Sequence, residues 1–170
     1  EGFMGNLWLN NELVDRLAML QQTEIEHFGI NQVAIEKDWW VTVTLKALFQ
    51  TECHEALIFK GGTSLSKGFN IIERFSEDID LILDWRKIVN NVNPWEERSK
   101  TKQDQFNKRI NTEAAKFYEK ELVPQLNIEI EGKLGRGEWV SVDKDDKMSE
   151  LLTISNEEDN SILLFVRIKK

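Results

Sequence analysis

The chain has 170 residues, 41 % of them hydrophobic and 31 % charged, which is ordinary for one globular domain with a buried core. Its formal net charge of −8 argues against a protein that coats nucleic acid non-specifically, although it leaves room for a local basic patch. Cys53 is the single cysteine, which excludes an intrachain disulfide. With no signal peptide and no long apolar run, we expect a cytoplasmic protein without a membrane segment.

The first third of the chain is expected to be helical. An asparagine cap would begin a helix that runs to about Gln22, and a second helical stretch is expected over 24–28. A longer helix is predicted over 32–49. Since it is apolar around much of its circumference, we expect it to pack on a sheet.

The middle of the chain alternates between strand and helix patterns. A short apolar strand is predicted over 56–59, a helix over 63–73 and a second strand over 78–85. In that second strand the acidic residues and Ile82 fall on one face, and the other face is entirely apolar, which indicates that this face is buried.

The last part begins with a long charged helix, predicted over 95–122. Between Arg98 and Lys120 it carries seven Lys or Arg and three Asp or Glu, so it is locally basic. This face would either bind an RNA backbone or simply be solvated. Further strands are predicted over 126–130, 138–142, 151–155 and 162–168. Helices, then mixed elements, then mostly strands indicate an α+β fold in a single domain, 1–170.

The first candidate site is the run Gly61, Gly62, Thr63 and Ser64. Two glycines after a strand allow a sharp turn and a close backbone approach. The N–H groups at the start of the next helix favour an anion such as a phosphate, and Lys67 would add a point charge. Taken alone, the run is more often a tight connection.

The second candidate site is the pair Asp78 and Asp80. Residues i and i+2 of a strand point the same way, about 6–7 Å apart at the backbone. Carboxylates held that close stay ionised when a cation lies between them, and hard oxygen ligands suit Mg²⁺ with substrate phosphates. Taken alone, the pair could line a solvated edge.

The two candidates strengthen each other through their order. A strand, a double-glycine turn, a helix and a neighbouring strand would place the helix start and the carboxylates at the same end of a sheet. Phosphates would then lie between N–H donors and metal, where such ions activate a hydroxyl and stabilise a pyrophosphate leaving group. Together the motifs predict a nucleotidyltransferase site over 60–83.

These residues resemble the AbiEii/AbiGii-type toxin family of the nucleotidyltransferase superfamily. The resemblance is carried by K-G-G-T-S-L-S-K over 60–67, by I-E-R-F-S-E-D-I-D-L over 72–81, and by E-K-D-W-W-V-T over 36–42. It implies a polymerase-β-like mixed sheet flanked by helices. It also implies Mg²⁺ at Asp78 and Asp80, with the triphosphate held by Gly61, Gly62, Thr63 and Ser64 and assisted by Lys67.

The resemblance further implies an enzyme that transfers a nucleotide from an NTP to an RNA acceptor, with tRNA the leading candidate. Its setting would be a bacterial toxin–antitoxin or phage-defence system, with a cognate antitoxin as partner. Two alternatives stay open: a truncated or degenerate module that acts by partner binding, and a nucleotidyltransferase that modifies a small molecule.

A third metal-binding carboxylate is normal in this superfamily. Glu129 and Glu131 share a face of the strand predicted over 126–130, so either is a candidate, but we favour a position beyond Lys170. Because the family is typically longer, we also expect the chain to lack a C-terminal helical part. The match therefore predicts the site more firmly than the activity of these 170 residues.

Overall fold

The computed structural model describes most of the chain, and at 78, 143, 150–151, 153, 155–156, 161–165 and 167–169 it describes the backbone alone. The described residues are 11–26, 30–61, 78–90, 92–93, 95–143, 150–156 and 161–169. The helix predicted over 63–73 lies outside them.

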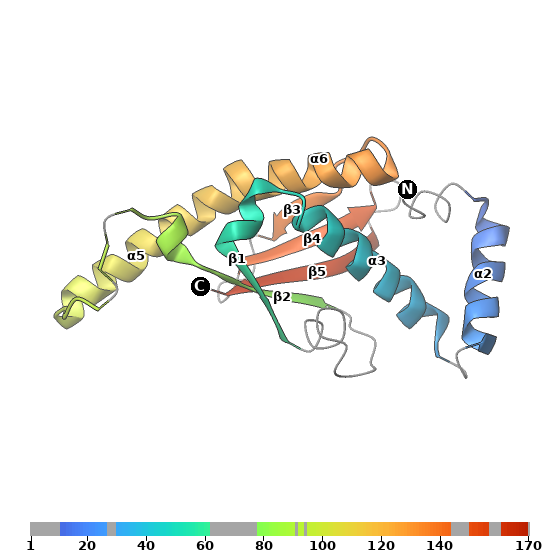
Figure 1. Cartoon of the computed structure of the whole chain (residues 1–170), viewed down its shortest axis with the longest axis horizontal. Helices are drawn as coiled ribbons and strands as arrows, with labels where there is room; N and C mark the ends of the chain where they lie inside the picture. The colour runs from blue at the N-terminus through green and yellow to red at the C-terminus, as the bar shows by residue number, and fades with distance from the viewer. Residues whose placement is uncertain are drawn as a thin grey trace.

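Five strands form one mixed sheet in the order β1-β2-β5-β4-β3 (Figure 1). They are β1 Leu57–Lys60, β2 Asp78–Leu83, β3 Val140–Asp143, β4 Glu150–Asn156 and β5 Ser161–Lys169. Neighbouring strands are antiparallel except β2 and β5, which run parallel. A mixed sheet accompanied by helices confirms the α+β class.

The helices are α2 Leu13–Glu26, α3 Gln32–Leu48, α5 Lys100–Phe117 and α6 Val123–Leu134, with short 3-10 turns η1 Glu52–Ala56 and η3 Trp85–Lys87. Asn31 caps α3, its side chain accepting a hydrogen bond from the Val33 N–H at 2.8 Å. The long helix predicted over 95–122 begins later, at Lys100, because the Ser99 side chain caps it there.

A π-helical turn, η4 Tyr118–Leu122, joins α5 to α6 into one continuous rod. Pro124 explains the turn, because its nitrogen has no hydrogen to give to the helix ladder. The Val123 N–H instead donates to the Tyr118 carbonyl, five residues back. The proline thus lies in the first turn of α6, where helices tolerate it.

The core lies between the sheet and two helices. Helix α3 contacts β5, α6 contacts β3, and the two helices contact each other, so both cover the same sheet face. In β2, Ile79, Leu81 and Leu83 are at most 1 % exposed, as the alternating pattern predicted. Asp80 alternates with these buried residues along β2, so its side chain lies on the opposite face of the sheet. Ile58 of β1 lies on that face too.

The strand predicted over 126–130 is wrong, because these residues belong to α6. Leu126 and Ile130, four residues apart, are fully buried, whereas Ile128 between them is 66 % exposed. In a strand all three side chains would share one face, while in a helix Ile128 points away from the other two. The alternating letters fit both periods over so short a run.

The three strands predicted at the C-terminal end are confirmed as β3, β4 and β5, with ends shifted by one or two residues. The first predicted helix extends to Glu26, so no break separates it from the second predicted stretch. None of the helices in the described ranges is long and apolar enough to cross a membrane.

Candidate functional site

Gly61 and Asp80, one residue from each predicted motif, meet in the folded chain. Gly61 has a φ of +78°, a left-handed conformation that glycine adopts without a steric penalty. A Cβ built on Gly61 would lie 2.7 Å from Oδ2 of Asp80 and 3.3 Å from its Cβ. The Asp80 carboxylate therefore occupies the space that a side chain at position 61 would need.

Strand pairing sets this contact. In the antiparallel β1–β2 ladder, Lys60 is paired with Asp80, and both residues are half-buried. In the parallel β2–β5 ladder, Asp80 is paired with Arg167 and Asp78 with Phe165. Asp80 thus lies between two basic positions in the sheet register.

Lys60 and Arg167 were not singled out as site residues from the sequence. Lys60 directly precedes the double glycine at the end of a strand, which is a weak signal for a role at the site. Arg167 lies 87 positions from Asp80, and only the strand order β2-β5 makes them neighbours. No local pattern could have found that pair.

Buried neighbours hold Asp80 in place. Ile79 and Leu81, on either side of it, are 0 % exposed. The strand therefore cannot shift by one residue without turning two core side chains to solvent and a carboxylate to the core. Such anchoring keeps the carboxylate at a defined position, as a binding site requires.

Several predicted site residues cannot be placed. Gly62, Thr63, Ser64 and Lys67 lie outside the described residues. The backbone of Asp78 begins β2, two residues before Asp80 and at the same end of the strand. Among the residues whose side chains the structure describes, no group of three His, Cys, Asp or Glu could hold a metal ion.

Glu129 and Glu131 were predicted to share a strand face, and this prediction is wrong. Both lie on α6, which packs on the core face of the sheet, whereas Asp80 is on the opposite face. Glu129 faces Lys133 with 3.8 Å between Oε2 and Nζ, and the Glu131 carboxylate accepts a hydrogen bond from the Gly137 N–H at 3.4 Å. Neither carboxylate joins the Asp80 site.

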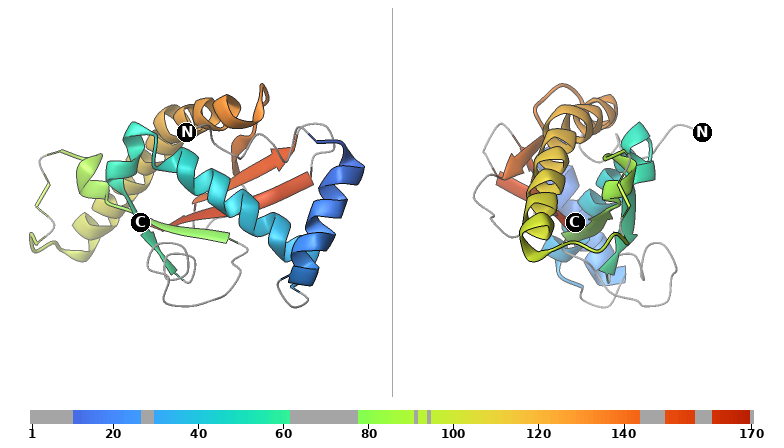
Figure 2. Two further views of the ribbon diagram at one scale, coloured as in Figure 1. Left: turned by 45° about the vertical axis from the view of Figure 1, so that its right-hand side comes forward. Right: turned by 90° about the vertical axis from the view of Figure 1, so that its left-hand side faces the viewer.

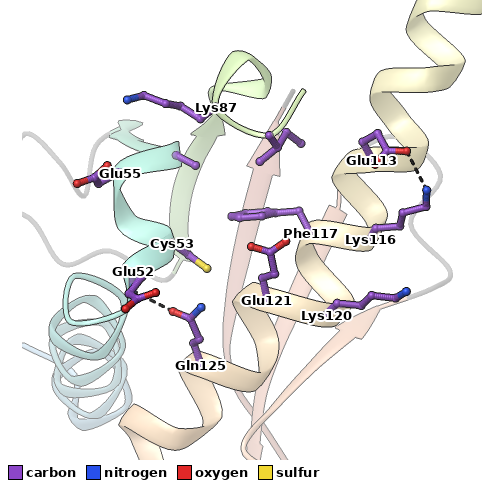
Figure 3. Close-up of a pocket in the computed structure, with 12 residues that line it drawn as sticks. Glu52, Cys53, Glu55, Lys87, Glu113, Lys116, Phe117, Lys120, Glu121 and Gln125 are labelled. Atoms are coloured by element: carbon purple, nitrogen blue, oxygen red, sulfur yellow. Dashed lines mark hydrogen bonds and ion pairs between the residues drawn. The ribbon is translucent and has the colours of Figure 1, made fainter. Parts of the chain in front are cut away.

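A separate cavity of about 570 Å³ lies at the opposite end of the β1–β2 pair, between η1, η3 and the α5–η4 rod (Figure 3). Cys53 contributes its thiol, and Glu52 and Glu121 contribute carboxylates. Burial, followed by the charges of Glu121 and Glu52, raises the pKa of Cys53 to about 11. The thiol is therefore protonated at neutral pH and unsuited to nucleophilic attack, in agreement with a structural role.

Of the two predicted metal ligands, Asp80 is the one whose side chain the structure describes. Its carboxylate provides the oxygen ligands that Mg²⁺ prefers. Because Gly61 has no side chain, the carboxylate lies directly against the Gly61 backbone. Lys60, the partner of Asp80 in the β1–β2 ladder, provides a positive charge that suits phosphate oxygens. Asp80 could therefore provide one ligand to a Mg²⁺ ion, with Lys60 beside it to face a phosphate.

Comparison with known proteins adds one finding. A family model described as "Nucleotidyl transferase AbiEii toxin, Type IV TA system" matches residues 44–163, more than two thirds of the chain. The matched range includes the double glycine, both aspartates, α5, α6 and the first two strands of the C-terminal meander. Among curated proteins and solved structures, no match is found.

Proposed function

Since the chain belongs to the AbiEii nucleotidyl transferase toxin family of type IV toxin–antitoxin systems, we propose that it transfers a nucleotide from an NTP to an RNA acceptor. tRNA is the leading acceptor, an antitoxin is the genetic partner, and the fold is a variant of the polymerase-β-like sheet. One observation carries the proposal: the Asp80 carboxylate lies against Gly61, which supports a shared site for the phosphate-binding turn and the acidic strand.

Each residue has a chemical role in this proposal. Asp78 and Asp80 would hold Mg²⁺, which when bound neutralises the triphosphate and lowers the pKa of the attacking hydroxyl. Lys60, across the ladder from Asp80, adds positive charge where phosphates would lie. On sequence alone, the backbone of 61–64 would bind the phosphates through N–H groups, with Lys67 assisting.

The test is a labelling experiment with paired variants. The protein is incubated with each labelled NTP, Mg²⁺ and total RNA, and the label is followed into RNA and into small molecules. Asp80→Asn and Asp78→Asn should lower transfer by at least roughly 10²-fold, because metal ligands supply several kcal/mol of transition-state stabilisation. Asp15→Asn, the same change on the exposed side of α2, is the matched control and should leave transfer intact.

Three results would overturn the proposal. Label that enters only small molecules would indicate the small-molecule alternative. No labelling with any NTP would indicate a module that acts by partner binding. Full transfer by both aspartate variants, with circular dichroism unchanged, would show that this site is not the catalytic one.

A further inference from the structure

Helix α5 carries a row of exposed cations in a chain that is acidic overall. Lys102, Arg109 and Lys116 are seven residues apart, which is about two helical turns, so they lie on one side about 10 Å apart along the axis. Gln105 and Thr112 fill the positions between them. We call Lys102, Arg109 and Lys116 the cationic row.

Intramolecular ion pairing accounts for one member of the row. Lys116 pairs with Glu113 at 2.8 Å, and the pKa of Glu113 is lowered chiefly by that hydrogen bond and slightly by Arg109. Lys102 and Arg109 form no ion pair with any other described residue. Both side chains are exposed, and apart from the weak effect of Arg109 on Glu113 their charges can face an anionic partner.

Trp95 is the second, independent observation. Its side chain is 88 % exposed, the largest exposure among the large hydrophobic side chains that the structure describes. A tryptophan so exposed contributes no core packing to the free protein, yet its ring is the best stacking surface among the side chains. Its backbone N–H donates to the Asn93 side chain at 3.0 Å, a local hydrogen bond at the base of the exposed ring.

Arg98 links Asn93 to Phe106 of α5, close to the cationic row. Its guanidinium lies 4.1 Å from the centre of the Phe106 ring and donates to the Asn93 carbonyl at 2.7 Å. Its side chain is 9 % exposed, so it acts as an anchor. Phe106 is four residues after Lys102 and three before Arg109, positions that are adjacent on a helix surface.

We propose that Trp95 and the cationic row form a binding surface for single-stranded RNA. Such surfaces combine cations that follow the backbone with an exposed aromatic ring on which a base stacks, without reading sequence. The N-terminal part of α5 extends beyond the sheet in both figures of the whole chain, so an RNA strand can reach it (Figures 1 and 2). RNA is named because the proposed function uses it as the acceptor.

The acidity of the chain as a whole limits where RNA can bind. The chain as a whole has a net charge of −8, which disfavours a polyanion, so binding would need a locally basic face. A solvated helix needs cations for solubility, but it does not need a bare tryptophan in the segment that Arg98 links to it. The two features together point to a nucleic-acid partner more strongly than either does.

The test measures binding of a fluorescein-labelled oligouridylate by anisotropy over a series of salt concentrations. Lys102→Gln/Arg109→Gln should reduce the slope of log K against log salt by about 1.4, since each phosphate contact contributes about 0.7 on a single strand. Lys100→Gln/Lys108→Gln removes the same charge from another side of α5 and should leave the slope unchanged.

Trp95→Ala should weaken binding by about 5- to 150-fold at every salt concentration with the slope unchanged, because it removes stacking and no charge. If the two double variants reduced the salt slope equally, or if Trp95→Ala bound oligouridylate normally, the proposed RNA-binding surface would be wrong. Oligodeoxythymidylate is the second probe, and equal or tighter binding of this DNA would overturn the assignment to RNA.

Asp80→Asn separates this surface from the catalytic proposal. It should abolish nucleotide transfer and keep oligouridylate binding. If Asp80→Asn abolishes transfer while the Trp95 and row variants bind RNA normally, the surface alone is wrong. If those variants lose RNA binding but wild-type protein labels nothing with any NTP, the proposed function alone is wrong.

Discussion

The contact between Gly61 and Asp80 can be tested by adding a single methyl group. In Gly61→Ala the new Cβ would lie 2.7 Å from Oδ2 of Asp80, closer than real Cβ contacts come. A left-handed φ costs an alanine about 1–2 kcal/mol, and turning the Asp80 side chain from its rotamer costs about 0.5–1.5 kcal/mol. We therefore expect a loss of about 1.5–3.5 kcal/mol in the free energy of unfolding.

The two contributions separate in a double-mutant cycle. Asp80→Ala removes the carboxylate, so Gly61→Ala in that background should cost only the backbone part, and the coupling should be about 0.5–1.5 kcal/mol. Gly135→Ala is the matched control, because Gly135 also has a positive φ, +101°, but nothing within 4 Å of an added Cβ. Its cost should be the same with and without Asp80.

Urea unfolding followed by tryptophan fluorescence measures all of these free energies, and nucleotide transfer is assayed in parallel. Gly61→Ala should also lower transfer, because the displaced carboxylate no longer lies where the turn and the strand meet. Zero coupling between positions 61 and 80, together with normal transfer by Gly61→Ala, would refute the close approach on which the site is built.

Three further predictions concern the rest of the fold. Ile130→Ala should cost about 2–5 kcal/mol of stability and Ile128→Ala less than about 0.5 kcal/mol, because the first is buried in α6 and the second is exposed; equal costs in urea unfolding would contradict the helix. Cys53, with its pKa raised to about 11 and its side chain buried, should react with a thiol reagent at neutral pH far more slowly in native than in urea-unfolded protein, and rapid native labelling would contradict that burial. Hydrogen bonding from Arg86 holds the pKa of Asp84 below its ordinary 3.8, so this carboxylate stabilises the fold above that pH and the contribution is lost as pH falls through the folded pKa; Asp84→Asn should flatten stability against pH in that acidic range, and an unchanged profile in acid titration would count against the pair.

Local sequence patterns were sufficient where one period dominated over enough residues. The alternation in β2 predicted which face is buried, and Ile79, Leu81 and Leu83 confirm it. The same reasoning failed over 126–130, where five residues fit a strand and a helix equally well. Tertiary packing decided that case, because the rod from α5 continues through Pro124 and buries Leu126 and Ile130.

For the candidate site too, some features follow from the sequence and others only from the tertiary structure. The amino-acid sequence by itself determined that a double glycine and a pair of aspartates stand in the order of a nucleotidyltransferase, because their spacing within the segment 60–83 is a local property. Only the tertiary structure decided that Gly61 touches Asp80, that Lys60 and Arg167 are its register neighbours, and that Glu129 and Glu131 lie across the sheet from it. Strand order and register depend on which apolar faces pack together over the whole chain, and no short window of sequence contains that information.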